Sequence, residues 1–126
     1  MKILVFGNPL VEEDSLPLRL LPRLRKKFTK IEFREFDSSE DLHKEGRDLV
    51  ILDTVKGIKK AQVIEDIGSI ILGKAYSLHD FDLGYNLKLL KKIGTIDSVK
   101  IIAVPASKDG EEVFTDLVNV IERIFH

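Results

Sequence analysis

Three side chains that can bind a metal ion or transfer a proton lie far apart in the sequence. They are Asp14, Asp53 and His79. Two carboxylates and one imidazole can form an open site for a hard or borderline divalent metal. The same set can instead act as a general base whose orientation is fixed by a carboxylate. The residue types therefore predict either a metal site or a proton-transfer site, provided that the fold brings them together.

Each of these residues also has a purely structural explanation. Asp14 closes an acidic cluster with Glu12 and Glu13, just before a segment with helical periodicity, and an acid there can cap the helix. Asp53 can simply end a strand, and His79 can be an ordinary loop residue. Position along the chain alone does not choose between these explanations and a functional site.

Two apolar runs predict where Asp14 and Asp53 lie. Residues 2–7 read KILVFG and residues 48–53 read DLVILD, which is the continuous apolar pattern of strands covered on both faces in a parallel sheet. Asp14 follows the first run, and Asp53 ends the second. Ligands in open α/β sheets bind at the carboxyl ends of the strands, so we expect both carboxylates at that edge. His79, which directly precedes a predicted helix, is expected there too.

The remaining pattern alternates strands with helices and predicts one α/β domain over residues 1–126. Its fold class is a three-layer sandwich, a mainly parallel twisted sheet with helices on both faces and an antiparallel edge strand. Pro22 falls inside the first predicted helix, which we expect it to kink or interrupt. The predicted strands are 2–7, 30–36, 48–53, 62–66 (the edge strand) and 99–104, and the predicted helices are 16–28, 83–92 and 109–124.

Composition narrows the possible function classes. The chain has 126 residues with 20 basic and 21 acidic side chains. It therefore lacks the large net charge that would favour binding to nucleic acid or to a membrane surface. It has no cysteine, which excludes disulfides, thiolate metal sites and a cysteine nucleophile. No apolar run approaches membrane-spanning length. We expect a cytoplasmic protein without nucleic-acid binding or membrane insertion.

Three motifs in order resemble the hydrogenase maturation endopeptidases, which remove the C-terminal extension from the large subunit of nickel-iron hydrogenases. The motifs are KILVFGNPLVEED at 2–14, DLVILDTVKG at 48–57, and SLHDFDLGYNLKLL at 77–90 with the later strand IIAVPAS. Matched to the family pattern, the second acid of the first motif is Asp14, the strand-end acid is Asp53 and the loop histidine is His79. The chain departs from the family at Ser15-Leu16-Pro17, where a Gly-x-Gly sequence is usual.

The resemblance implies a function as well as a fold. It implies a peptidase whose partner is the hydrogenase large-subunit precursor, and whose catalytic and metal-engaging residues are Asp14, Asp53 and His79. The nickel would arrive within the substrate and would not be held tightly by the free enzyme. Oxygen and nitrogen ligands here would complement the cysteine thiolates of the precursor. We expect the enzyme to be a monomer.

Two other function classes are compatible with the residues. Asp53 at a strand end and Lys108 after the last strand loosely fit a response-regulator receiver domain, in which the aspartate accepts a phosphoryl group. However, Gly7 and Asn8 follow the first strand where a receiver has its acidic pair. The third class is a non-catalytic binding domain on the same fold.

Overall fold

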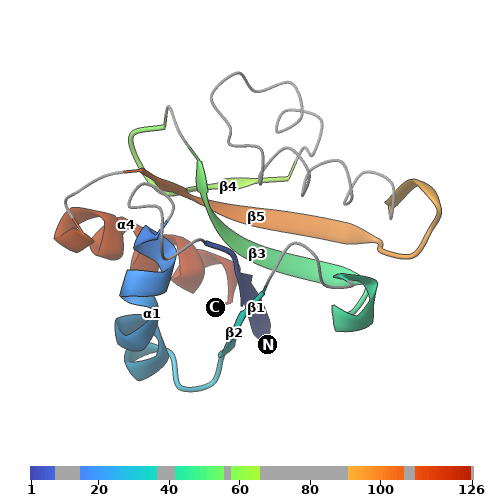
Figure 1. Cartoon of the computed structure of the whole chain (residues 1–126), viewed down its shortest axis with the longest axis horizontal. Helices are drawn as coiled ribbons and strands as arrows, with labels where there is room; N and C mark the ends of the chain where they lie inside the picture. Colours follow the sequence, from blue (N-terminus) through green and yellow to red (C-terminus); the bar gives the residue numbers. More distant parts are fainter. Residues whose placement is uncertain (8–14, 37–41, 56–57, 66–90, 107–109, 126) are drawn as a thin grey trace.

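The computed structural model describes residues 1–7, 15–36, 42–55, 58–65, 91–106 and 110–125. Figure 1 shows a layer of strands with helices packed against it. In chain order the elements are β1 (Lys2–Val5), α1 (Leu16–Lys27), β2 (Glu32–Glu35), the short 3-10 helix η2 (Leu42–Glu45), β3 (Asp48–Val55), β4 (Gln62–Ile64), β5 (Ser98–Pro105) and α4 (Gly110–Ile124).

The described strands form one five-stranded sheet in the order β2-β1-β3-β5-β4. β1 pairs in parallel with β2 and β3, and β3 pairs in parallel with β5 over its full length. β4 is an edge strand antiparallel to β5. The predicted α/β fold, with a mainly parallel sheet and an antiparallel edge strand, is confirmed, and the edge strand predicted over 62–66 is observed at Gln62–Ile64.

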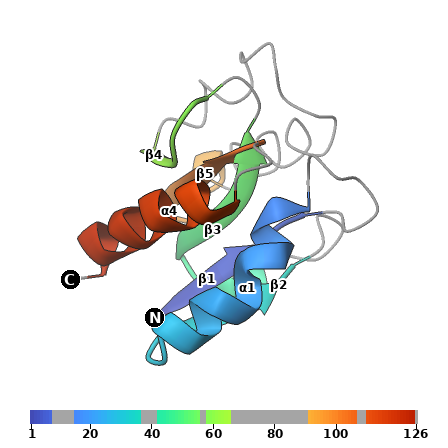
Figure 2. The same cartoon turned by 90° about the vertical axis from the view of Figure 1, so that its left-hand side faces the viewer.

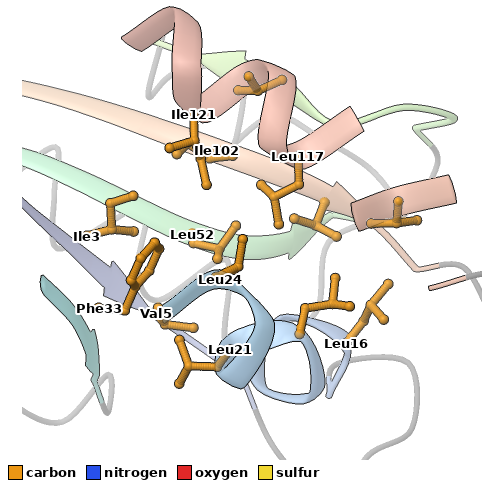
Figure 3. Close-up of a cluster of buried hydrophobic side chains, with 14 of the residues drawn as sticks. Ile3, Val5, Leu16, Leu21, Leu24, Phe33, Leu52, Ile102, Leu117 and Ile121 are labelled. Carbon is orange, nitrogen blue, oxygen red and sulfur yellow. The ribbon is translucent and has the colours of Figure 1, made fainter. Parts of the chain in front are cut away.

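One face of the sheet is covered by α1 and α4. The helices bury leucine, isoleucine and valine side chains spaced three or four residues apart against alternate residues of the strands. Figure 3 shows these side chains converging between the helices and the sheet. The labelled members of this cluster are Ile3, Val5, Leu16, Leu21, Leu24, Phe33, Leu52, Ile102, Leu117 and Ile121.

The opposite face of the sheet has its own buried cluster. Leu4, Phe6 and Ile51 alternate with the residues that face α1 and α4, and Leu42 of η2 packs on them. The phenyl rings of Phe6 and Phe36 lie 5.5 Å apart, centroid to centroid. The helix predicted over 83–92 falls outside the described residues except for its last two. The third layer of the predicted sandwich therefore stays a prediction.

Of the two outcomes predicted for Pro22, a kink or an interruption of the helix, the structure excludes the interruption. α1 runs from Leu16 to Lys27 without interruption, with Pro22 inside it. A proline there removes one backbone hydrogen bond. Leu20, Leu21 and Leu24 are buried on both sides of it, and their burial offsets that loss. Pro17 lies in the first turn, where its missing N–H costs nothing.

Two strands extend beyond their predicted ends, and one helix residue is less buried than expected. β3 continues through Thr54 and Val55, so Asp53 lies near its carboxyl end and not at its last residue. β5 includes Pro105, which was expected to follow it. Ile124, expected in the core, is half-buried, while Val120 is buried in α4.

Ion pairs hold the elements together at the amino ends of the strands. The carboxylate of Glu45 lies 2.9 Å from Lys2 Nζ and 3.2 Å from Arg34 Nη1, which joins η2 to β1 and β2. Arg47 donates two hydrogen bonds to the Asp97 carboxylate and one to the carbonyl of Gly94. These contacts fix the entry into β3 and β5 at the end opposite Asp53. None of the described helices has the length and apolar character needed to cross a membrane.

Candidate functional site

The chain reverses its direction of winding between β1 and β3. From β1 it passes through α1 to β2 on one side, whereas β5 and β4 lie on the other side of β3 (Figure 1). In open α/β sheets the crevice at such a switch point, at the carboxyl ends of the strands, is where ligands bind. The N–H of Phe6, just after β1, donates to the carbonyl of Leu52 at 2.9 Å and keeps the two strands together up to this edge.

Asp53 lies at this switch point and is 2% exposed. Its Oδ1 accepts a hydrogen bond of 2.8 Å from the backbone N–H of Thr54. By strand alternation its side chain is on the same face as Ile51, away from α1 and α4. A buried carboxylate is costly unless it is hydrogen-bonded or paired. The hydrogen bond from the Thr54 N–H offsets part of that cost.

The strand neighbours of Asp53 are apolar. In the sheet register Asp53 is opposite Ala103 of β5, while Phe6 follows Val5, the β1 partner of Leu52. Phe6 and Ala103 are both fully buried. The described strand neighbours therefore give Asp53 an apolar setting, in which charge interactions are stronger than in water.

Thr54 is a buried polar residue that the sequence reading did not identify. It follows Asp53, faces the side of α1 and α4 by alternation, and its hydroxyl has no hydrogen-bond partner within the described parts of the chain. The group of Thr54 that contributes to the site is its backbone N–H, which donates a hydrogen bond to Asp53 Oδ1. A threonine inside an apolar run is typical of a strand in any case, so only the alternation pattern signals that it faces away from Asp53.

α1 begins after the carboxyl end of β1, and so its first residues follow the carboxyl edge of the sheet. Ser15 is buried at the N-cap position, and its hydroxyl accepts a hydrogen bond from Arg19 Nε at 3.1 Å without capping the helix. No acidic residue lies in the first turn of α1. Despite the departure from the family pattern at Ser15-Leu16-Pro17, α1 begins at Leu16. Asp14 directly precedes Ser15 in the sequence.

Comparison with solved structures identifies the architecture. An endopeptidase from Escherichia coli superposes with a TM-score of 0.68 at 17% identity, covering 98% of this chain and 90% of that one. The hydrogenase maturating endopeptidase HybD from E. coli gives 0.66 at 19% identity with the same coverage. The hydrogenase 3 maturation protease gives 0.57 at 14% identity, covering 99% and 86%. The chain has the fold of the hydrogenase maturation endopeptidases. No protein-family model and no curated protein matches the sequence.

Within this maturation-endopeptidase fold, the structure locates one of the three predicted site residues. Asp53 is at the carboxyl edge of the sheet, as expected. Asp14 and His79 fall outside the described residues, and so do Asn8 and Lys108. The described part of the chain contains no group of three side chains that could hold a metal ion. The convergence of Asp14, Asp53 and His79 on one ion stays a prediction.

Proposed function

We propose that this chain is an endopeptidase that removes the C-terminal extension from the large-subunit precursor of a nickel-iron hydrogenase. It would act in the cytoplasm as a monomer, after nickel has been inserted into the precursor. The observation that carries the proposal is the buried Asp53 carboxylate at the switch point of a maturation-endopeptidase fold. Aspartate is rarely this buried in a folded protein, so a buried aspartate at the ligand-binding edge of the sheet supports a functional role.

The donor set supports recognition of a nickel ion that belongs to the substrate. Asp53 offers oxygen, and Asp14 and His79 would add a second oxygen and a nitrogen. The chain has no cysteine, so soft sulfur ligands would come from the precursor. Two carboxylates and one imidazole are too few to fill the coordination sphere of a divalent ion. The free enzyme is therefore expected to carry little metal, and a nickel-loaded precursor is expected to complete the site.

The chemistry required is hydrolysis of one peptide bond. A water oxygen attacks the carbonyl carbon, the carbon–nitrogen bond breaks, and a proton passes to the leaving amine. Asp14 or Asp53 can take the proton from the water as a general base. The substrate nickel supplies Lewis-acid activation when it is bound. The buried position of Asp53 suits a general base and also a ligand of the substrate nickel, because charge interactions are strong where water is excluded.

The sheet argues against the receiver alternative. Receiver domains have a doubly wound sheet in the order 2-1-3-4-5. In this chain the order is β2-β1-β3-β5-β4, and β4 runs antiparallel to β5. If Asp53 were a phosphoacceptor, acetyl phosphate and magnesium would give a single-phosphate adduct that disappears in Asp53→Asn. We expect intact mass spectrometry to detect no adduct.

The proposal is tested by mixing the purified chain with a hydrogenase large-subunit precursor, either nickel-loaded or metal-free. We expect a mass decrease equal to the C-terminal extension only for the loaded precursor. Equal trimming of the metal-free precursor would refute nickel-based recognition while leaving a protease. Absence of trimming in both would favour a non-catalytic binding domain on this fold.

Variants at Asp14 and His79 test the rest of the site. His79→Ala would remove the one nitrogen ligand, and Asp14→Ala would remove one of two anionic ligands. Loss of a metal ligand costs several kcal/mol of transition-state stabilisation, or about a thousandfold in rate. Asp116→Asn on α4 is the matched control, since it removes a carboxylate that is not one of the predicted ligands. Full activity in both site variants would rule out this ligand set.

A further inference from the structure

A hollow lies at the opposite end of the molecule from Asp53. It is a pocket of about 410 Å³ at the amino ends of the strands, and we call it the amino-end pocket. Three segments that are distant in sequence form it: the residue before β1, the turn from α1 to β2, and the end of α4. Figure 2 shows these ends of the two helices and of β1 on one side of the molecule. The lining residues are Met1, Lys27, Phe28, Thr29, Lys30, Ile31, Ile121, Glu122 and Phe125.

The floor of the amino-end pocket is apolar and its rim is charged. Ile31 and Ile121 are buried, and Phe28 and Phe125 are half-buried against the core. The side chains at the rim are charged and exposed, and they include Lys27 and Lys30. The floor therefore offers hydrophobic contact, while the polar groups are confined to the edge.

The rim carries more positive than negative charge. Two lysines face one acid, Glu122, and within the described residues neither lysine is in an ion pair. Lys27 lies in the last turn of α1, where a cation balances the helix dipole. Lys30 lies beyond the helix, so that explanation does not apply to it. The rim is electrostatically complementary to carboxylates.

This arrangement matches a protein-binding surface better than a metabolite site. Small-molecule pockets place a few polar groups inside the cavity to orient the ligand. Protein interfaces instead bury an apolar anchor at the centre and keep charges at the rim. The volume suffices for one or two large side chains, and the mouth includes the exposed side chain of Met1.

We propose that the amino-end pocket binds a segment of a partner protein in which a large apolar side chain is flanked by carboxylates. The apolar side chain enters between Ile31 and Ile121, and the carboxylates pair with Lys27 and Lys30. Asp53 lies at the other end of β3, so this contact is separate from the candidate site and does not depend on the proposed peptidase function.

The probe is a fluorescein-labelled peptide of about twelve residues with a Phe-Leu pair between glutamates, titrated with the whole chain by fluorescence anisotropy. We expect saturable binding of this peptide. A peptide with lysines in place of the glutamates should not bind, and neither should one with serines in place of Phe-Leu. Binding by the lysine peptide, or none by the acidic one, would overturn the proposal. Binding of decanoate without the acidic peptide would identify a small amphipathic acid instead and also overturn it.

Charge-reversal variants locate the contact. Lys27→Glu with Lys30→Glu should weaken binding at least about tenfold, since both rim ion pairs are lost and repulsion replaces them. Lys59→Glu with Lys60→Glu makes the same change in net charge at the exposed turn before β4 and should leave binding unchanged. Equal weakening by both pairs would show non-specific attraction and refute the site. Methyl NMR shifts at Ile31 and Ile121 upon binding are the direct readout expected.

Discussion

The ion pairs of Glu45 give a stability prediction that depends on burial. The Glu45 side chain is 7% exposed, while its partners Lys2 and Arg34 are 31% and 48% exposed. Either cation can remain hydrated without the acid, but the acid cannot be hydrated without a structural change. The carboxylate therefore needs at least one cation, and the two cations can partly replace each other.

The magnitudes follow from this asymmetry. Lys2→Met or Arg34→Met alone leaves Glu45 with one partner, and each should cost about 1 kcal/mol, as for a partly exposed pair. The double variant leaves an uncompensated buried carboxylate, which costs about 3–5 kcal/mol. The double loss should therefore exceed the sum of the single losses by at least about 1 kcal/mol. For a chain of this length that excess lowers the melting temperature by roughly 4 °C.

Urea unfolding of the three variants at neutral pH measures these differences. Adding Glu45→Gln to the double variant is the internal control, because it removes the buried charge and should recover part of the lost stability. If the two single losses simply add up to the double loss, or if Glu45→Gln gives no recovery, the carboxylate is effectively solvated and the reasoning is wrong.

Two further predictions concern Thr54 and Asp97. Thr54→Val removes a buried hydroxyl without a partner among the described residues and keeps the side-chain shape, so unfolding free energy should be unchanged or rise by about 1 kcal/mol; a loss above about 1 kcal/mol in urea unfolding would show that the hydroxyl is satisfied. The hydrogen bond from Arg47 holds the pKa of the Asp97 carboxyl below its ordinary value of 3.8, and the charge of Arg47 adds to that lowering. The stabilisation is therefore present above that pH and lost as pH falls through the lowered pKa, so the stability difference between the parent chain and Asp97→Asn should shrink in acid; a difference that stays constant from neutral pH into that range would contradict the assignment.

The central strands and Asp53 were predictable because their signals are local. The runs 2–7 and 48–53 are apolar throughout, as required of strands covered on both faces, and an acid at the end of the second run stands out. The order of the sheet then places Asp53 at the switch point. The same local reasoning could not decide whether Pro22 would interrupt the helix, because helix propensity does not include the burial of Leu20, Leu21 and Leu24 around it.

Features that depend on contacts between distant residues could not be predicted. Lys2 and Glu45 are 43 positions apart, and nothing in either segment marks them as partners. The amino-end pocket is likewise formed by the turn after α1 and the end of α4. The positions of Asp14 and His79 depend on segments outside the described residues, so the sequence still provides the only argument for their role.

The most direct test of the account is the single-turnover cleavage rate of a nickel-loaded precursor by Asp53→Asn compared with the parent chain. The asparagine keeps the size of the side chain and an oxygen that can accept from the Thr54 N–H, so it mainly removes the charge. Asp48→Asn, at the exposed amino end of the same strand, is the matched control. We expect a loss of about a thousandfold for Asp53→Asn and an unchanged rate for Asp48→Asn. An unchanged rate in folded Asp53→Asn would contradict it.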